Sequence, residues 1–275
     1  LRSELSHEPE RVQLFLDEAN LVAHLRHPNI VQALDLSRDG SDYFMALELV
    51  DGPSLANLIG YTRGVGTRIP IEIGAHVVAE AARGLHYAHE AQGADGEALE
   101  VVHRDIRPGN ILISQLGEVK VADFSAALSS SSRWAARKGM RASAYVGPEQ
   151  RADEGAIDRR ADVYALGVVL WELGTGRPLD QADDAPGEIP PPSELDPRLD
   201  FRFDAIVARA TAARPEDRYA SAEALADAVQ SWLSEFGRPT GREELGKWMR
   251  ASCPDLGPGG LTPLEAWTDS GVLRT

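Results

Sequence analysis

The stretch that decides the fold is VVHRDIRPGNILIS, residues 101–114, followed by VADFS at residues 121–125. Asp105, Asn110 and Asp123 lie in or beside loops between short apolar runs. Carboxylate and amide oxygens grouped on loops are hard ligands that suit a magnesium ion carrying phosphate. Asp and Asn also form ordinary turns, but the string HRDxxPxN followed by a strand-borne DF is far more specific. This stretch therefore indicates a phosphate and magnesium site.

The residues before this stretch predict a helix and a small antiparallel sheet. Residues 10–26 place apolar side chains at helical spacing, and Pro28 ends that helix. Residues 30–40 and 43–52 are short apolar runs that meet around Asp39-Gly40, which is typical of paired strands.

The rest of the chain is mostly helical in pattern. Residues 71–90 and 160–174 are apolar on most sides and predict two buried core helices, the second started by Asp162. Residues 101–128 predict two short strand pairs around tight turns, one of them at Leu116-Gly117. Further helices are predicted at residues 203–213, 221–236 and 243–251. This order favours an α+β fold in which a small mixed lobe precedes a large helical one.

Composition sets the class of protein. The 275 residues are 43% hydrophobic and 26% charged, which is typical of a globular chain with a sizeable core. The net charge of −15 disfavours nonspecific binding to nucleic acid or to an anionic membrane, because both are polyanions. The single cysteine, Cys253, suits a reducing compartment. With no apolar run near the roughly 20 residues that cross a bilayer, and no visible signal peptide, we expect a cytoplasmic location.

These motifs resemble those of one family. HRDIRPGN resembles the catalytic loop of eukaryotic-type protein kinases, and DFS resembles a variant of their DFG motif. The resemblance covers almost the whole chain, and its wording looks most like the bacterial serine/threonine kinases. Four further segments carry it, namely FLDEANLVAHLRHPNIV (15–31), ALELVDGPSL (46–55), VGPEQ (146–150) and ADVYALGVVLWEL (161–173). RPEDRY, residues 214–219, resembles the segment whose arginine, here Arg218, pairs with the glutamate of the APE motif, here Glu149.

The resemblance implies a two-lobe kinase fold that uses ATP and Mg²⁺ on a protein substrate. Asp105 would accept or orient the proton of the substrate hydroxyl. Asn110 and Asp123 would hold Mg²⁺, and Arg107 stands where serine/threonine kinases usually have the lysine that contacts the γ-phosphate. Positioning and charge neutralisation of this kind supply most of the catalysis of phosphoryl transfer.

The resemblance also implies a nucleotide site. Leu47 would be the gatekeeper, Glu48 and Val50 would offer backbone groups to adenine, and Leu112 would form the floor beneath it. Glu18 would occupy the ion-pair position of the small lobe's helix.

The chain departs from the family pattern in four places. It starts at Leu1, after the glycine-rich loop and the strand bearing the phosphate lysine, so we read it as N-terminally truncated with a partial N-lobe. Arg107 replaces lysine, and Ser125 replaces the glycine of DFG. Ala142 stands where a threonine would bridge the catalytic aspartate and the loop cation, with Ser143 adjacent to it.

We therefore expect a kinase domain at residues 1–236, with the partial N-lobe at 1–50 and the C-lobe at 51–236, and a C-terminal extension at 237–275. The alternative is a pseudokinase that binds nucleotide or serves as a scaffold. Small-molecule kinases share the fold, but the APE-like and RPEDRY segments favour protein substrates. A structural protein would not explain the ordered run of motifs, and the oligomeric state is left open.

Overall fold

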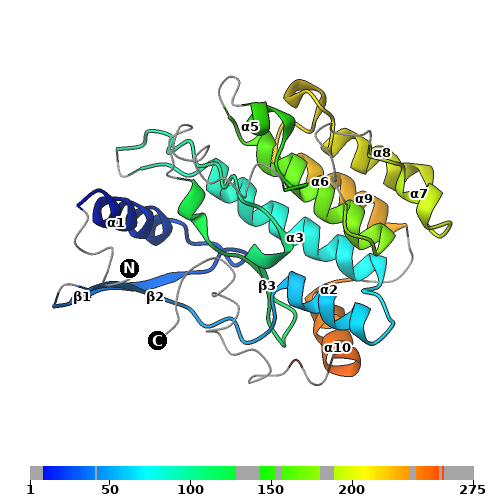
Figure 1. The fold of residues 1–275 in the computed structure, drawn as a ribbon, viewed down its shortest axis with the longest axis horizontal. Helices are drawn as coiled ribbons and strands as arrows, with labels where there is room; N and C mark the ends of the chain where they lie inside the picture. Colours follow the sequence, from blue (N-terminus) through cyan, green and yellow to red (C-terminus); the bar gives the residue numbers. More distant parts are fainter. Residues whose placement is uncertain are drawn as a thin grey trace.

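The computed structural model describes residues 9–40, 42–93, 95–127, 143–152, 157–179, 189–235, 240–253 and 256. A helix and a two-stranded sheet lie at one side of a larger group of helices (Figure 1). This arrangement is the α+β, two-lobe organisation predicted from the sequence. The helices are α1 (Pro9–His24), α2 (Leu55–Gly64), α3 (Ile71–His89), α5 (Pro148–Ala152), α6 (Arg160–Thr175), α7 (Pro192–Leu195), α8 (Phe201–Ala210), α9 (Ala222–Ser234) and α10 (Arg242–Ser252). The strands are β1 (Ala33–Asp39), β2 (Asp42–Leu47), β3 (Ile111–Ile113) and β4 (Val119–Val121).

The small lobe forms as the sequence predicts. In α1 the side chains of Ala19 and Val22 are buried, as expected of its apolar stripe. Strands β1 and β2 pair antiparallel, and Gly40 turns the chain between them with a φ of +57°. That left-handed conformation suits glycine because it has no Cβ.

The large lobe is built around α3, which packs against α6 and α9 (Figure 1). Small residues on α3 allow close approach. At Gly84 a Cβ would lie 2.6 Å from the carbonyl oxygen of Asn29, so only glycine lets the segment after α1 reach this helix. Asn29 in turn accepts a hydrogen bond from the amide of Val121 at 2.8 Å and donates from Nδ2 to the carbonyl of Val119 at 2.9 Å. The small lobe is thereby joined to the β3–β4 hairpin.

Two of the predictions are wrong in detail. Among the described residues of the range 101–128 there is one strand pair, β3 with β4. Residues 101–106 form no strand, because part of their backbone bonds instead to the side chain of Asp162 on α6. Asp162 does not start α6, which begins at Arg160; its carboxylate faces inward instead.

Helix α2 was not predicted. It begins after Ser54, whose Oγ accepts a hydrogen bond from the amide of Asn57 at 3.2 Å. Within the part of the chain that the structure describes, no helix combines the length and apolarity needed to span a membrane.

A buried ion pair joins α5 to the segment before α9. Arg218 donates from Nη1 and Nη2 to the two carboxylate oxygens of Glu149, each at 2.7 Å, which confirms the predicted pairing. The Arg218 side chain is 0% exposed, and it also donates to the carbonyls of Ala212, Ala213 and Arg160. Such a pair is costly to break because the remaining charge stays buried.

We predict that Arg218→Leu lowers the free energy of unfolding by about 3–5 kcal/mol, because both carboxylate oxygens of Glu149 lose the cation that they accept from in a buried place. Urea unfolding followed by circular dichroism measures this. The control is Arg214→Ala, since Arg214 pairs with Asp217 on the exposed surface. Equal stability of the two variants would contradict the structural role of Arg218.

Candidate functional site

The loop that carries the predicted catalytic residues is held by the carboxylate of Asp162. Asp162, fully buried on α6, accepts hydrogen bonds from the backbone amides of His103 and Arg104, both at 2.8 Å. The Nε2 of His89, on α3, lies 2.8 Å from the same carboxylate. Asp162 therefore joins two core helices to the backbone immediately before Asp105.

Sequence reasoning missed this role. The available signal was an aspartate beside the long apolar run of helix 160–174, since a charged side chain is rarely buried unless it is paired. Burial raises the pKa of Asp162, but its hydrogen bond to His89, the charges of His89 and His103 and the amide of Arg104 outweigh burial and leave the pKa below its usual value.

Asp105 and Asn110 meet inside the loop. The Nδ2 of Asn110 donates to the Asp105 carbonyl at 2.8 Å and to its carboxylate at 3.2 Å, and the Nε of Arg107 lies 3.5 Å from that carboxylate. Burial raises the pKa of Asp105, and nearby Asp123 raises it further, whereas Arg107, His103 and the Asn110 hydrogen bond lower it. The net pKa is above the ordinary value, as suits a group that exchanges a proton.

The DFS segment is held beside this loop by His103. Its ring is buried, with Nε2 3.0 Å from the carbonyl oxygen of Ala122 and its centroid 4.7 Å from that of Phe124. Asp123 adopts a left-handed backbone with φ 66° and ψ 74°, and its carboxylate accepts from the amide of Ser125 at 3.3 Å. A non-glycine residue in this region stores strain, which is typical of functional sites.

Ser125 itself is not strained. Among the residues whose backbone the structure describes, the non-glycine residues with positive φ are Glu100, Arg104 and Asp123. The conformational freedom of glycine is therefore not needed at position 125 in this conformation.

The β3–β4 hairpin brings Asn110 and Asp123 to neighbouring strand ends. Asn110 immediately precedes β3, Asp123 follows β4, and the amide of Ala122 donates to the Asn110 carbonyl at 2.9 Å. With Nδ2 of Asn110 bonded to Asp105, its side-chain oxygen remains for a cation, and Asp123 adds a carboxylate. One carboxylate and one amide oxygen, completed by phosphate oxygens and water, form a donor set that fits Mg²⁺.

The predicted adenine residues lie where the segment at the end of β2 meets the β3–β4 hairpin, which itself contains Leu112. The carboxylate of Glu48 accepts from the amide of Gln32 and from Nζ of Lys120 on β4, both at 2.8 Å. Leu112 bridges to Ser54, just after the segment that contains Leu47 and Val50. Glu48 and Leu112 therefore both lie at the junction between the two lobes.

Two expected positions fall outside the described residues. Ala142 belongs to a segment that the structure does not describe, and on α1 the side chain of Glu18 is likewise outside the description. Ser143 is described, and its carbonyl accepts from the amide of Val146 at 3.2 Å.

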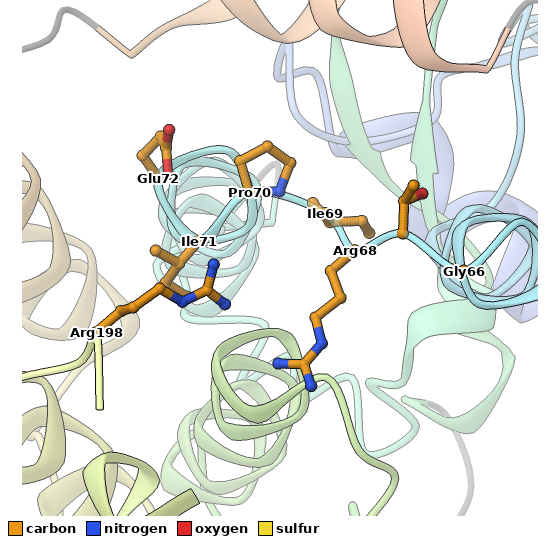
Figure 2. A pocket seen from close by; sticks show the side chains of 8 residues that line it. Gly66, Arg68, Ile69, Pro70, Ile71, Glu72 and Arg198 are labelled. Atoms are coloured by element: carbon orange, nitrogen blue, oxygen red, sulfur yellow. The ribbon is translucent and has the colours of Figure 1, made fainter. Parts of the chain in front are cut away.

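A separate hollow of about 520 Å³ lies between the loop after α2 and Arg198 (Figure 2). Arg68 and Arg198 both extend into it, but each pairs with Asp196, at 3.3 Å and 2.6 Å. Their charge is therefore partly neutralised, and the residues that line the hollow belong to none of the motifs.

Comparison with known proteins agrees with this geometry. The protein kinase domain family matches residues 2–191, and the chain belongs to it. The chain is 39% identical to tyrosine-protein kinase MasK of Myxococcus xanthus over 90% of its length and 40% of that protein. It is 33% identical to serine/threonine-protein kinase PrkC of Bacillus subtilis over 81% of its length and 34% of that protein. It thus spans well under half of either relative.

The fold matches a solved kinase. The PknI kinase domain of M. tuberculosis superposes with a TM-score of 0.65 at 27% identity, covering 85% of this chain and 83% of that one. The two-lobe kinase fold is therefore shown both by sequence relatives and by structure.

We predict that Asp162→Asn lowers the free energy of unfolding by about 3 kcal/mol near neutral pH, because two amides and His89 lose a charged acceptor. The pKa of Asp162 is depressed in the folded state, so its contribution is present above the unfolded pKa and is lost as pH falls through the folded one. The variant lacks that acid dependence. Urea unfolding across this pH range measures both effects.

The control for this experiment is Asp200→Asn. Asp200 caps α8 through the amides of Arg202 and Phe203, and asparagine is also a good N-cap. If both variants lose the same stability, Asp162 is not the special anchor of the loop.

Proposed function

We propose that this chain is the catalytic part of a serine/threonine protein kinase that transfers the γ-phosphoryl group of ATP to a protein hydroxyl. The observation that carries the proposal is the gathering of Asp105, Asn110 and Asp123 by the Asp162 anchor and the β3–β4 hairpin. These groups match the parts that phosphoryl transfer needs, a base near the nucleophile and hard ligands for a cation.

Asp105 orients the substrate hydroxyl and accepts its proton. Its carboxylate is largely buried, with 18% of the side chain exposed, and Asn110 holds it in place. Arg107 is 43% exposed and offers a cation beside it, in a position to meet phosphate oxygens. Arginine binds phosphate as readily as lysine but with a planar, wider group.

Asn110 and Asp123 hold Mg²⁺. Bound Mg²⁺ neutralises charge on the phosphates of ATP. For adenine, Glu48 and Val50 provide backbone groups, with Leu47 as gatekeeper and Leu112 as floor. The Glu48 side chain is already bonded to Gln32 and Lys120, which leaves recognition to the backbone of this segment. Glu18 serves as the ion-pair glutamate.

The proposal includes the setting of the domain. The kinase domain covers residues 1–236, divided at residue 50 into the N-lobe and the C-lobe, and residues 237–275 extend it. The substrate is a protein, the location is cytoplasmic, and nucleic acid is not a partner, which the net charge of −15 supports.

Two alternatives are distinguished by experiment. A pseudokinase would keep ATP binding without transfer, and the arginine at 107 and alanine at 142 favour it. The name of MasK, tyrosine-protein kinase, raises the choice between tyrosine and serine or threonine hydroxyls.

We predict that the full-length gene product phosphorylates a generic protein with Mg-ATP, and that Asp105→Asn lowers the rate about 10²–10⁴-fold, because the proton acceptor is lost. Transfer of ³²P followed by phosphoamino acid analysis measures the rate and identifies serine, threonine or tyrosine. Asp227→Asn, on the exposed side of α9, is the control. Stabilisation by ATP without transfer in the wild type would identify a pseudokinase.

We also predict a pH effect of Arg107. The base must be ionised, and its raised pKa places the acid limb of kcat/KM above the ordinary carboxyl range. Because the charge of Arg107 lowers that pKa, Arg107→Gln moves the acid limb to higher pH, whereas Arg107→Lys leaves it near wild type. A lower rate at every pH with an unmoved limb would show that Arg107 acts on phosphate alone.

A further inference from the structure

Helix α10 lies against the turn between β3 and β4, residues 114–118 (Figure 1). From the helix, Nη1 of Arg250 donates to the carbonyl of Gln115 at 2.7 Å, and Nη2 of Arg242 pairs with Glu118 at 2.9 Å. From the turn, Nε2 of Gln115 donates to the carbonyl of Leu256, beyond the end of α10, at 2.8 Å. The turn is thus bonded to both ends of this helical segment.

Two glycines allow the backbones to meet. Gly117 turns the hairpin with φ +80°, and a Cβ there would lie 2.0 Å from the carbonyl oxygen of Arg242. Gly246 faces the same turn, where a Cβ would lie 3.0 Å from the carbonyl carbon of Leu116. A glycine inside a helix costs about 1 kcal/mol relative to alanine, so close approach is a physical reason for Gly246.

The other side of α10 belongs to the core. Leu245, Met249 and Cys253 are each at most 1% exposed and pack in the same apolar cluster as α3 and α6. The helix is therefore fixed to the large lobe while it holds the turn. It can therefore fix the position of the hairpin relative to the core.

The hairpin connects this contact to the candidate site. The turn and the site lie at opposite ends of β3 and β4, separated by three residues at roughly 3.3 Å each. Asn29 bonds along the outer edge of β4, to the carbonyl of Val119 and the amide of Val121. Asn29 thus holds β4, and at the turn, the end away from Asn110 and Asp123, α10 adds its contacts to the backbone hydrogen bond from Gln115 to Asp51.

We propose that α10 is a positioning element for the phosphoryl-transfer site, with Gly246 and Arg250 as positioning residues for the magnesium ligands Asn110 and Asp123. The inference rests on the proposed function, because that function identifies the cation as Mg²⁺. With β4 held by Asn29, release of α10 lets the turn and β3 shift against β4, which separates the two ligands and weakens their hold on Mg²⁺.

The test compares Gly246→Leu with Ala251→Leu in the full-length protein. Leucine at 246 strengthens the helix but forces it off the turn, whereas position 251 is exposed on the same helix. Hydrogen exchange measured by mass spectrometry follows the amides of residues 110–123 without nucleotide. The Mg²⁺ concentration for half-maximal phosphate transfer is the second readout.

We expect Gly246→Leu to speed hydrogen exchange across residues 110–123. We also expect it to raise the half-saturating Mg²⁺ concentration roughly 3–10-fold, which is at or below the low end of the loss of metal affinity caused by removing groups that support metal ligands. Ala251→Leu behaves like wild type. Faster exchange confined to residues 240–256, with the hairpin and the Mg²⁺ requirement unchanged, overturns the proposal.

Arg250 gives an independent variant that adds no bulk. Arg250→Ala removes the hydrogen bond to Gln115 and shifts both readouts in the same direction, while Arg250→Lys restores part of it. If Gly246→Leu does not fold, this pair decides by the same criteria. If the wild type transfers no phosphate, the proposed function fails, and hydrogen exchange in the hairpin still tests the role of α10.

Discussion

The structure depends on the buried carboxylate of Asp162. It satisfies two backbone amides in a loop that forms no strand, and it does so from the first turn of the core helix α6, while His89 of α3 also bonds to it. A buried carboxylate is stable only when its hydrogen bonds and charges are matched. The hydrogen bonds that Asp162 needs therefore hold the loop against the core. The residues that follow, from Asp105 to Asn110, are positioned by this attachment.

A second constraint is backbone strain at the same place. Arg104 and Asp123 both have left-handed backbones, at φ 65° and 66°, on the two segments that meet at the site. Strain of about 1–3 kcal/mol per residue persists only where the surroundings impose the conformation. Asp162 imposes it on Arg104 through the amide, and the buried ring of Phe124 against His103 fixes the backbone next to Asp123.

Much of this could be predicted from the sequence. Apolar periodicity predicts α1, α3, α6, α9 and α10, and the motif resemblance predicts the Arg218–Glu149 pair. Three features were not predicted. The inward turn of Asp162, the clamp of α10 on the hairpin turn and the absence of a second strand pair all depend on contacts between segments far apart in the chain. The helix and strand propensities of single residues do not encode such contacts.

If Asn110 and Asp123 form one cation site, nucleotide affinity depends on that site. Titration calorimetry of the full-length protein with a non-hydrolysable ATP analogue, with and without Mg²⁺, tests it most directly when repeated for Asp123→Asn. We expect Mg²⁺ to strengthen binding in the wild type and the variant to lose most of this gain while remaining folded. An equal gain from Mg²⁺ in both proteins would contradict it.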